Sequence, residues 1–180
     1  MKNLEIYIHI PFCVRKCEYC DFLSFPADDD AKLRYVKGLM AEMIFYGPLM
    51  KNYQVSSVYI GGGTPSSIDE QWIAALMEGV FDCFNVLPDA EISIECNPGT
   101  LSREKLLAYR DAGINRLSIG LQSANNDELK LLGRIHTFEQ FVTNYEVARN
   151  VGFKNINVDL MYGLPGQSAS QYMATVNKII

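Results

Sequence analysis

Five short segments of the chain alternate apolar and polar residues, and each predicts a β-strand. They span residues 4–10, 55–60, 91–96, 114–121 and 154–162. The first reads LEIYIHI, with leucine or isoleucine at every second position and Glu5, Tyr7 and His9 between them. Because successive side chains of a strand point to opposite faces, such a strand has one apolar and one polar face.

The stretches between these segments have helical periodicity. They cover roughly residues 29–50, 69–84, 102–112 and 138–151, and a further helix begins near Ser168. Asp69, Ser102 and Thr137 stand where helix N-caps are expected. Parallel strands need long crossover connections of this kind, so the order predicts an α/β fold with a parallel sheet. An antiparallel sheet with one face in water would also alternate, but the intervening helices count against it.

The polar face of the predicted sheet is unusual, because buried parallel strands normally read as continuous apolar runs. Polar positions recur on the later strands at Glu91, Ser93, Glu95, Arg116, Ser118, Gln122, Asn155, Asn157 and Asp159. We therefore expect helices on the apolar face, and a polar face that lines an open or wide barrel around a polar ligand. Five βα units do not close a barrel of eight, so we expect a fragment of a longer protein.

Composition narrows the classes of function. The chain has 180 residues, 48% of them hydrophobic, and a formal net charge of −5, which argues against nucleic-acid binding because phosphate recognition needs a basic face. No apolar run is long enough to span a membrane and no export leader is visible. Five cysteines, three of them crowded together, then favour intracellular thiols over a disulfide framework. We expect a cytoplasmic protein without a membrane span.

The crowded cysteines are Cys13, Cys17 and Cys20, in the pattern C-x3-C-x2-C. Thiolates bind zinc or iron–sulfur clusters, and structural zinc normally takes four protein ligands. Here Cys83 lies in a predicted helix and Cys96 ends a strand, so the group has three. Three thiolates on a [4Fe–4S] cluster would leave one iron open to substrate. The spacing favours a cluster, with a zinc site or an incidental grouping as alternatives.

A glycine-rich stretch, YIGGGTPS, covers residues 59–66 after the second strand. It lacks the Gly-Lys-Ser/Thr of a P-loop and does not fit the dinucleotide-binding pattern. Its glycines permit close backbone approach. A plain tight turn is the other interpretation.

The C-x3-C-x2-C loop after a first strand resembles the signature of the radical S-adenosylmethionine (SAM) superfamily. This resemblance implies a partial (β/α) barrel over residues 1–180 and a [4Fe–4S] cluster held by the three cysteines. The fourth iron would be chelated by the amino and carboxylate groups of SAM, whose cleavage gives methionine and a 5′-deoxyadenosyl radical. The glycine-rich stretch looks like the superfamily's GGE-type motif.

Six ordered stretches resemble one family within it, the oxygen-independent coproporphyrinogen III oxidases and their haem-chaperone branch. They are YIHIPFC, GGGTPS, IECNPGTL, RLSIGLQS, LGRIHT and NVDLMYGLPGQ. The resemblance implies SAM contacts at Tyr7, Gly62, Gly63, Thr64, Glu95, Gln122, Arg134 and Asp159, and Tyr19 is expected to line the adenine pocket. No catalytic residue is assigned.

Four of these residues also have a plainer interpretation. Glu95 could cap the turn at Pro98–Gly99, and Arg134 could be an exposed charge at a helix end. Asp159 could be a solvated edge residue, and Tyr19 could be loop packing. His9 is expected to be a hydrogen-bonded barrel histidine rather than a metal ligand.

Two departures favour the haem-chaperone branch. The oxidase continues its motif to a further cysteine two positions past the third, where this chain has Phe22, and the oxidase has an extension before its first strand. We expect haem or a porphyrin as partner, with haem-acceptor proteins for a chaperone or an electron donor for an enzyme. The alternatives are an oxidase that decarboxylates coproporphyrinogen III to protoporphyrinogen IX, another radical SAM enzyme, or the fold without radical chemistry.

Overall fold

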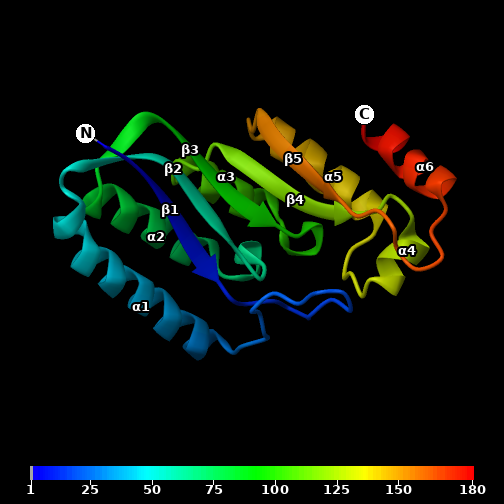
Figure 1. The fold of residues 1–180 in the computed structure, drawn as a ribbon, viewed down its shortest axis with the longest axis horizontal. Helices are drawn as coiled ribbons and strands as arrows, with labels where there is room; N and C mark the ends of the chain where they lie inside the picture. The colour runs from blue at the N-terminus through cyan, green and yellow to red at the C-terminus, as the bar shows by residue number, and fades with distance from the viewer. Residues whose placement is uncertain (1) are drawn as a thin grey trace.

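The computed structural model describes residues 2–180, which form one sheet with helices packed against it. The strands are β1 (Lys2–Ile10), β2 (Tyr53–Gly62), β3 (Val86–Cys96), β4 (Arg116–Gln122) and β5 (Asn155–Leu160). They lie in chain order and every neighbouring pair is parallel (Figure 1). The predicted parallel α/β sheet is confirmed, and the antiparallel alternative is wrong.

The helices connect successive strands, as the periodicity predicts. They are α1 (Asp29–Tyr46), α2 (Glu70–Cys83), α3 (Arg103–Asp111), α4 (Asn126–Leu131), α5 (Phe138–Asn150) and α6 (Ala169–Ile179), with 3-10 turns at η1 (Gly47–Met50), η2 (Pro65–Ser67) and η3 (Pro98–Thr100). The side chains of Asp69, Ser102 and Thr137 cap α2, α3 and α5 as expected. None of the helices in residues 2–180 is long and apolar enough to cross a membrane.

Three elements differ from the sequence expectations by more than two residues. The helix expected over 29–50 ends at Tyr46 and continues as a 3-10 turn, because Pro48 lacks the N–H that the next helical turn needs. Helix α4 is new, and its six residues are too short to show a periodicity. Strand β3 begins at Val86, and its pairing with β2 is irregular until Ser57 meets Glu91.

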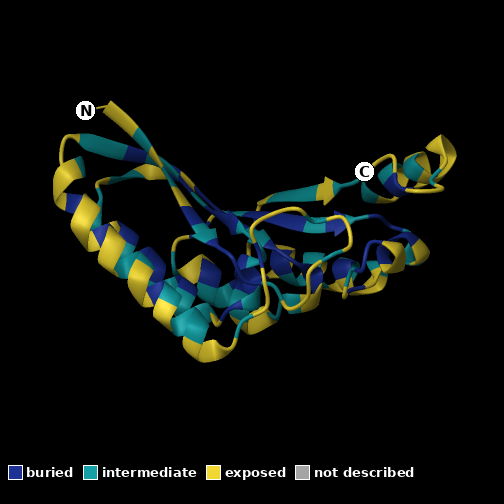
Figure 2. Cartoon of the chain, turned by 60° about the horizontal axis from the view of Figure 1, so that its bottom comes forward, coloured by how far each residue is buried: buried dark blue, intermediate teal, exposed yellow. Residues whose placement is uncertain are grey.

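The core lies between the sheet and the helices on its apolar face. One row of the sheet register runs through Ile8, Ile60, Ile94, Leu117 and Ile156. Ile60, Ile94 and Leu117 are fully buried, and residues of α2 and α3 pack in the same cluster. Figure 2 shows the buried residues concentrated along the sheet and the inner sides of these helices.

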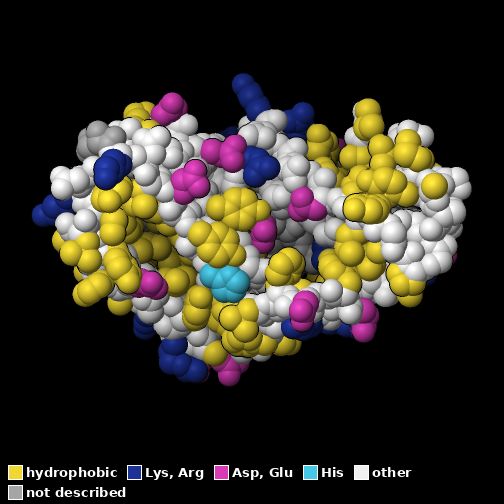
Figure 3. Space-filling model, viewed as in Figure 1, with side chains coloured by type: hydrophobic (Ala, Val, Ile, Leu, Met, Phe, Trp, Pro, Cys, Tyr) yellow, Lys and Arg dark blue, Asp and Glu magenta, His cyan; other side chains and the backbone are white. Residues whose placement is uncertain are grey.

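The opposite face of the sheet carries the polar row that alternation predicts. Tyr7, Tyr59, Ser93, Arg116 and Asn155 are successive partners across the five strands. Figure 3 looks onto this face, where charged and hydrophobic side chains mix around a hollow. The separation of the two faces is therefore confirmed.

Replacing the central core residue tests this packing. Ile94→Ala should lower the free energy of unfolding by about 2–5 kcal/mol, because a buried aliphatic side chain leaves a cavity when truncated. Ile44→Ala on α1, where the side chain is 67% exposed, is the matched control and should change it by less than about 0.5 kcal/mol. Denaturant unfolding measures both, and equal losses would contradict this placement of the core.

Candidate functional site

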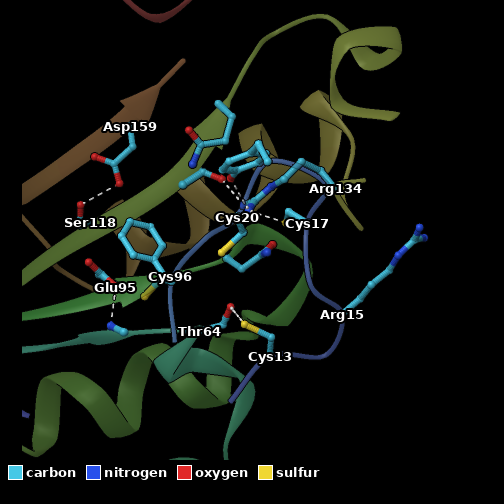
Figure 4. A pocket seen from close by; sticks show the side chains of 17 residues that line it. Cys13, Arg15, Cys17, Cys20, Thr64, Glu95, Cys96, Ser118, Arg134 and Asp159 are labelled. Atoms are coloured by element: carbon cyan, nitrogen blue, oxygen red, sulfur yellow. Dashed lines mark hydrogen bonds between the residues drawn. The ribbon is translucent and has the colours of Figure 1, made fainter. Parts of the chain in front are cut away.

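A pocket opens at the carboxyl ends of the strands and encloses about 160 Å³ (Figure 4). Segments far apart in the sequence line it, and they include every predicted site residue except Tyr7. The lining residues are Cys13, Arg15, Cys17, Tyr19, Cys20, Phe22, Gly62, Gly63, Thr64, Glu95, Cys96, Asn97, Ser118, Gly120, Gln122, Arg134 and Asp159.

The loop between β1 and α1 carries the three clustered cysteines, and its base is closed by backbone hydrogen bonds. The N–H of Cys13 donates to the carbonyl of Phe25 at 3.2 Å, and the N–H of Phe25 donates to Pro11 at 2.9 Å. Phe12 is buried beneath, with its ring against those of Phe25 and Tyr35. The anchored base holds the cysteine segment over the pocket.

The three thiols are free and half-buried, and each has a different polar neighbour. Cys13 Sγ lies 3.5 Å from Thr64 Oγ1, Cys17 Sγ accepts from Arg134 Nη1 at 3.6 Å, and Cys20 Sγ lies 4.0 Å from Ser24 Oγ. Within residues 2–180, no three His, Cys, Asp or Glu side chains converge closely enough to hold a metal ion. The thiols thus share one pocket without being gathered at one point.

This donor set fits an iron–sulfur cluster, because thiolates are the usual protein ligands of such clusters. Gly63, on the wall of the pocket, leaves space beside the Cys13 thiol. A Cβ at Gly63 would lie 3.0 Å from Cys13 Sγ and 2.8 Å from the carbonyl oxygen of Phe12. The glycine therefore lets the end of β2 approach the cysteine loop.

The glycine-rich stretch is more than a plain turn. The N–H of Gly63 donates to Ile10 and that of Thr64 to Phe12, both at 2.8 Å. Gly62 has a φ of +122°, which favours glycine, and a Cβ there would meet the His9 ring at 2.8 Å. These contacts fasten the stretch to β1 and the start of the cysteine loop.

Glu95 reaches the pocket from the end of β3 with both carboxylate oxygens held. Oε1 accepts from the hydroxyl of Tyr59 at 2.9 Å and Oε2 from the N–H of Gly62 at 3.0 Å. Burial raises the pKa of Glu95, and the two hydrogen bonds oppose that rise. The interpretation of Glu95 as a turn cap is wrong, because Asn97 accepts the N–H of Gly99 instead.

Arg134 lies between α4 and α5 and joins two sides of the pocket. Its guanidinium donates to the carbonyl of Gly120 at 2.5 Å, to the Tyr19 hydroxyl at 3.4 Å and to Cys17 Sγ. It is half-buried, so the interpretation as an exposed helix-end charge is wrong. The hydrogen bond with Arg134 also places Tyr19 at the pocket rather than in unrelated loop packing.

Gln122 and Asp159 complete the far side of the pocket. Gln122 has a φ of +73°, a left-handed conformation that is uncommon for a residue with a side chain, and its carbonyl accepts from Met161 N–H at 2.9 Å. Asp159 is exposed on the edge strand β5 and accepts from Ser118 at 3.1 Å and from Asn157 at 2.7 Å.

Tyr7 does not line the pocket and is 58% exposed on the polar face. Its hydroxyl lies 3.0 Å from His9 Nδ1, and its ring stacks on Tyr59 with centroids 6.2 Å apart. His9 Nε2 lies 3.2 Å from the carbonyl oxygen of Leu23. His9 is hydrogen-bonded through both ring nitrogens, as expected.

Sequence reasoning missed other residues of the site. Arg15, Cys96, Asn97, Ser118 and Gly120 line the pocket, and Tyr59 supports it through Glu95. The alternation along β2 could have found Tyr59, since it falls on the polar face two positions before Gly61. Cys96 is 5% exposed, and this burial raises the pKa of its thiol.

The sequence profile of the radical SAM superfamily matches residues 7–179. The chain belongs to this superfamily. Membership implies a [4Fe–4S] cluster and SAM as cofactors, and it confirms the expected fold class.

Its curated relatives include two bacterial proteins named heme chaperone HemW. The protein of Escherichia coli K12 is 38% identical over 183 aligned positions, covering 98% of this chain and 47% of the relative. That of Bacillus subtilis 168 is 39% identical over 172 positions, covering 95% and 45%. This radical SAM chain thus spans about half the length of the curated relatives it matches.

Among solved structures, the chain is similar to coproporphyrinogen III oxidase (HemN) of Escherichia coli, described as a radical SAM enzyme. The TM-score is 0.91 at 33% identity, covering 99% of this chain and 41% of the oxidase. Methylornithine synthase shares the fold at a TM-score of 0.64 and 14% identity. The expected resemblance to the oxidase family and its chaperone branch is confirmed.

Proposed function

We propose that Cys13, Cys17 and Cys20 bind a [4Fe–4S] cluster with SAM beside it, and that the whole protein is a haem chaperone. The observation that carries the cofactor proposal is one pocket lined by three free thiols together with Glu95, Gln122, Arg134 and Asp159. When bound, the cluster and SAM supply a reductive cleavage of the SAM sulfonium.

The residues around the thiols have chemistry that suits the parts of SAM. The Arg134 guanidinium is a donor for the methionine carboxylate. Glu95 accepts two hydrogen bonds from the protein, and a carboxylate has capacity for about two more, which suits an ammonium or ribose hydroxyls. Gln122 and Asp159 provide further acceptors on the opposite side.

The remaining predicted residues shape the binding space. Gly62, Gly63 and Thr64 form the wall next to Cys13, and we propose that their backbone approaches SAM. Tyr19 offers an aromatic ring for the adenine. The predicted contact of Tyr7 with SAM stays a prediction. The Tyr7 side chain contacts His9 and Tyr59 and does not line the pocket.

The chaperone assignment is supported by the identity of 38–39% to proteins named heme chaperone HemW. It is also supported by Phe22, which is 69% exposed at the pocket where the oxidase pattern has a further cysteine. The decarboxylating oxidase is the second candidate, favoured by the TM-score of 0.91 to HemN. We propose haem as the cargo, haem-acceptor proteins as partners and the cytoplasm as the compartment, with an electron donor required if the protein is catalytic.

Metal content tests the cysteine ligands. Anaerobically purified protein should contain about four irons and matching sulfide per chain, and Cys13→Ala, Cys17→Ala or Cys20→Ala should each abolish the cluster. Cys83→Ala is the control, because Cys83 ends α2 and does not line the pocket. Iron and acid-labile sulfide assays decide the matter. Stoichiometric zinc, or cluster loss in the Cys83 variant, would contradict the assignment.

SAM affinity tests the two acidic residues. Glu95→Ala or Asp159→Ala should weaken binding by about 1.5–3 kcal/mol, the range for hydrogen bonds to charged groups. Glu91→Ala is the matched control, since Glu91 lies on the same face of β3 but outside the pocket lining. Calorimetric titration of SAM into reconstituted protein measures affinity, and melting curves check stability. The placement of SAM is wrong if both variants lose stability while keeping their affinity.

The two candidate functions separate in one anaerobic experiment on the full-length protein. A haem chaperone should bind haem in a saturable titration, pass it to an acceptor and leave coproporphyrinogen III unchanged in the presence of SAM and reductant. Spectral titration follows haem, and product chromatography follows the porphyrin. Steady decarboxylation without a stable haem complex would favour the oxidase instead.

A further inference from the structure

Tyr59 occupies a place on the sheet from which it controls an acidic side chain of the pocket. Its register partner on β3 is Ser93, two residues before Glu95. The phenol reaches diagonally across to the neighbouring strand, a distance that aromatic side chains span. There its hydroxyl donates to Glu95 Oε1 at 2.9 Å.

The second oxygen of the carboxylate is held from the same strand. The N–H of Gly62 donates to Glu95 Oε2 at 3.0 Å. With one donor on each oxygen, the carboxylate plane is fixed between the side chain of Tyr59 and the backbone of β2. The carboxylate is therefore oriented before any ligand arrives.

Gly61 makes this contact possible. A Cβ at Gly61 would lie 2.8 Å from Tyr59 Cε1 and 3.2 Å from Glu95 Cδ, closer than side-chain carbons pack. Any larger residue would push the phenol and the carboxylate apart. The glycine therefore leaves the space in which the two side chains meet.

The Tyr59 hydroxyl remains protonated and can donate its hydrogen bond throughout the neutral pH range. Partial burial and the hydrogen bond to Glu95 raise the pKa of Tyr59, so the hydroxyl keeps its proton at neutral pH. Its ring also stacks on Tyr7 at an interplanar angle of 18°, which restricts its rotation.

We propose that Tyr59 is a positioning residue that orients the Glu95 carboxylate toward the cationic amino group or ribose hydroxyls of SAM. This inference rests on the proposed cofactor site. The other groups that act on Glu95 are Asp159, which raises the pKa of Glu95, and His9, which lowers it. Loss of the Tyr59 hydroxyl removes a donor to the ionised form, so the pKa of Glu95 must rise further.

The test is Tyr59→Phe in the full-length protein, which keeps the ring and removes the hydroxyl. In cofactor-free protein, a 13C-carboxyl NMR titration should show Glu95 protonating at a higher pH than in the wild type. In reconstituted protein, the dissociation constant for SAM at neutral pH should rise about three- to tenfold, the effect of losing one ordinary hydrogen bond. On acidification, affinity should begin to fall at a higher pH than in the wild type.

Tyr145→Phe is the matched control, because it removes a phenol hydroxyl from α5, where the ring packs on Phe141 and Arg149 and does not line the pocket. It should leave the Glu95 titration and SAM affinity unchanged. The inference is overturned if Tyr59→Phe moves neither, or if it lowers only thermal stability. If the wild type binds no SAM while the Glu95 titration still shifts in Tyr59→Phe, the cofactor proposal fails and the positioning of Glu95 by Tyr59 stands.

Discussion

Parallel pairing of all five strands is the constraint on which the site depends. It brings the carboxyl ends of the strands to one edge of the sheet, where α/β folds place their ligands. The cysteine loop leaves β1 there, the glycine-rich stretch leaves β2, and Glu95, Gln122 and Asp159 end or approach the ends of β3, β4 and β5. Parallel pairing therefore makes neighbours of strand-end residues that the sequence separates widely.

The two faces of the sheet differ because the helices pack on only one of them. Helices α1, α2, α3 and α5 bury the apolar row through Ile60, Ile94 and Leu117 (Figure 2). This packing fixes the register of the strands, because a slip by one residue would turn the isoleucines to the polar side. The same register aligns the polar row from Tyr7 to Asn155 on the other face. The packing of aliphatic side chains on one face thus positions the polar side chains on the other face.

Much of the fold was predictable because its signals are local. The caps at Asp69, Ser102 and Thr137 and the alternation along the strands each depend on a few adjacent residues. Contacts that depend on strand register were not predictable. Examples are the diagonal hydrogen bond from Tyr59 to Glu95 and the capping of the Pro98–Gly99 turn by Asn97, where Glu95 was one expected cap. The short helix α4 and the irregular start of β3 gave no period to detect. For the site, the cysteine spacing and the resemblance together identified eleven of the pocket-lining residues. Tyr7 was expected there too, but its side chain packs on His9 and Tyr59 instead.

The contacts of Arg134 have a consequence for the order in which the molecule is assembled during synthesis. The cysteine loop is made early, yet Cys17 and Tyr19 take their guanidinium partner from a residue more than a hundred positions later. The N–H of Glu18 likewise donates to Leu132 at 3.1 Å. A nascent chain that ends before these residues carries all three thiols, but Cys17 and Tyr19 still lack the guanidinium that they contact in the folded protein. Because contacts of such long sequence separation form late, the ribosome must release all of β4 and α4 before Cys17 and Tyr19 gain this partner.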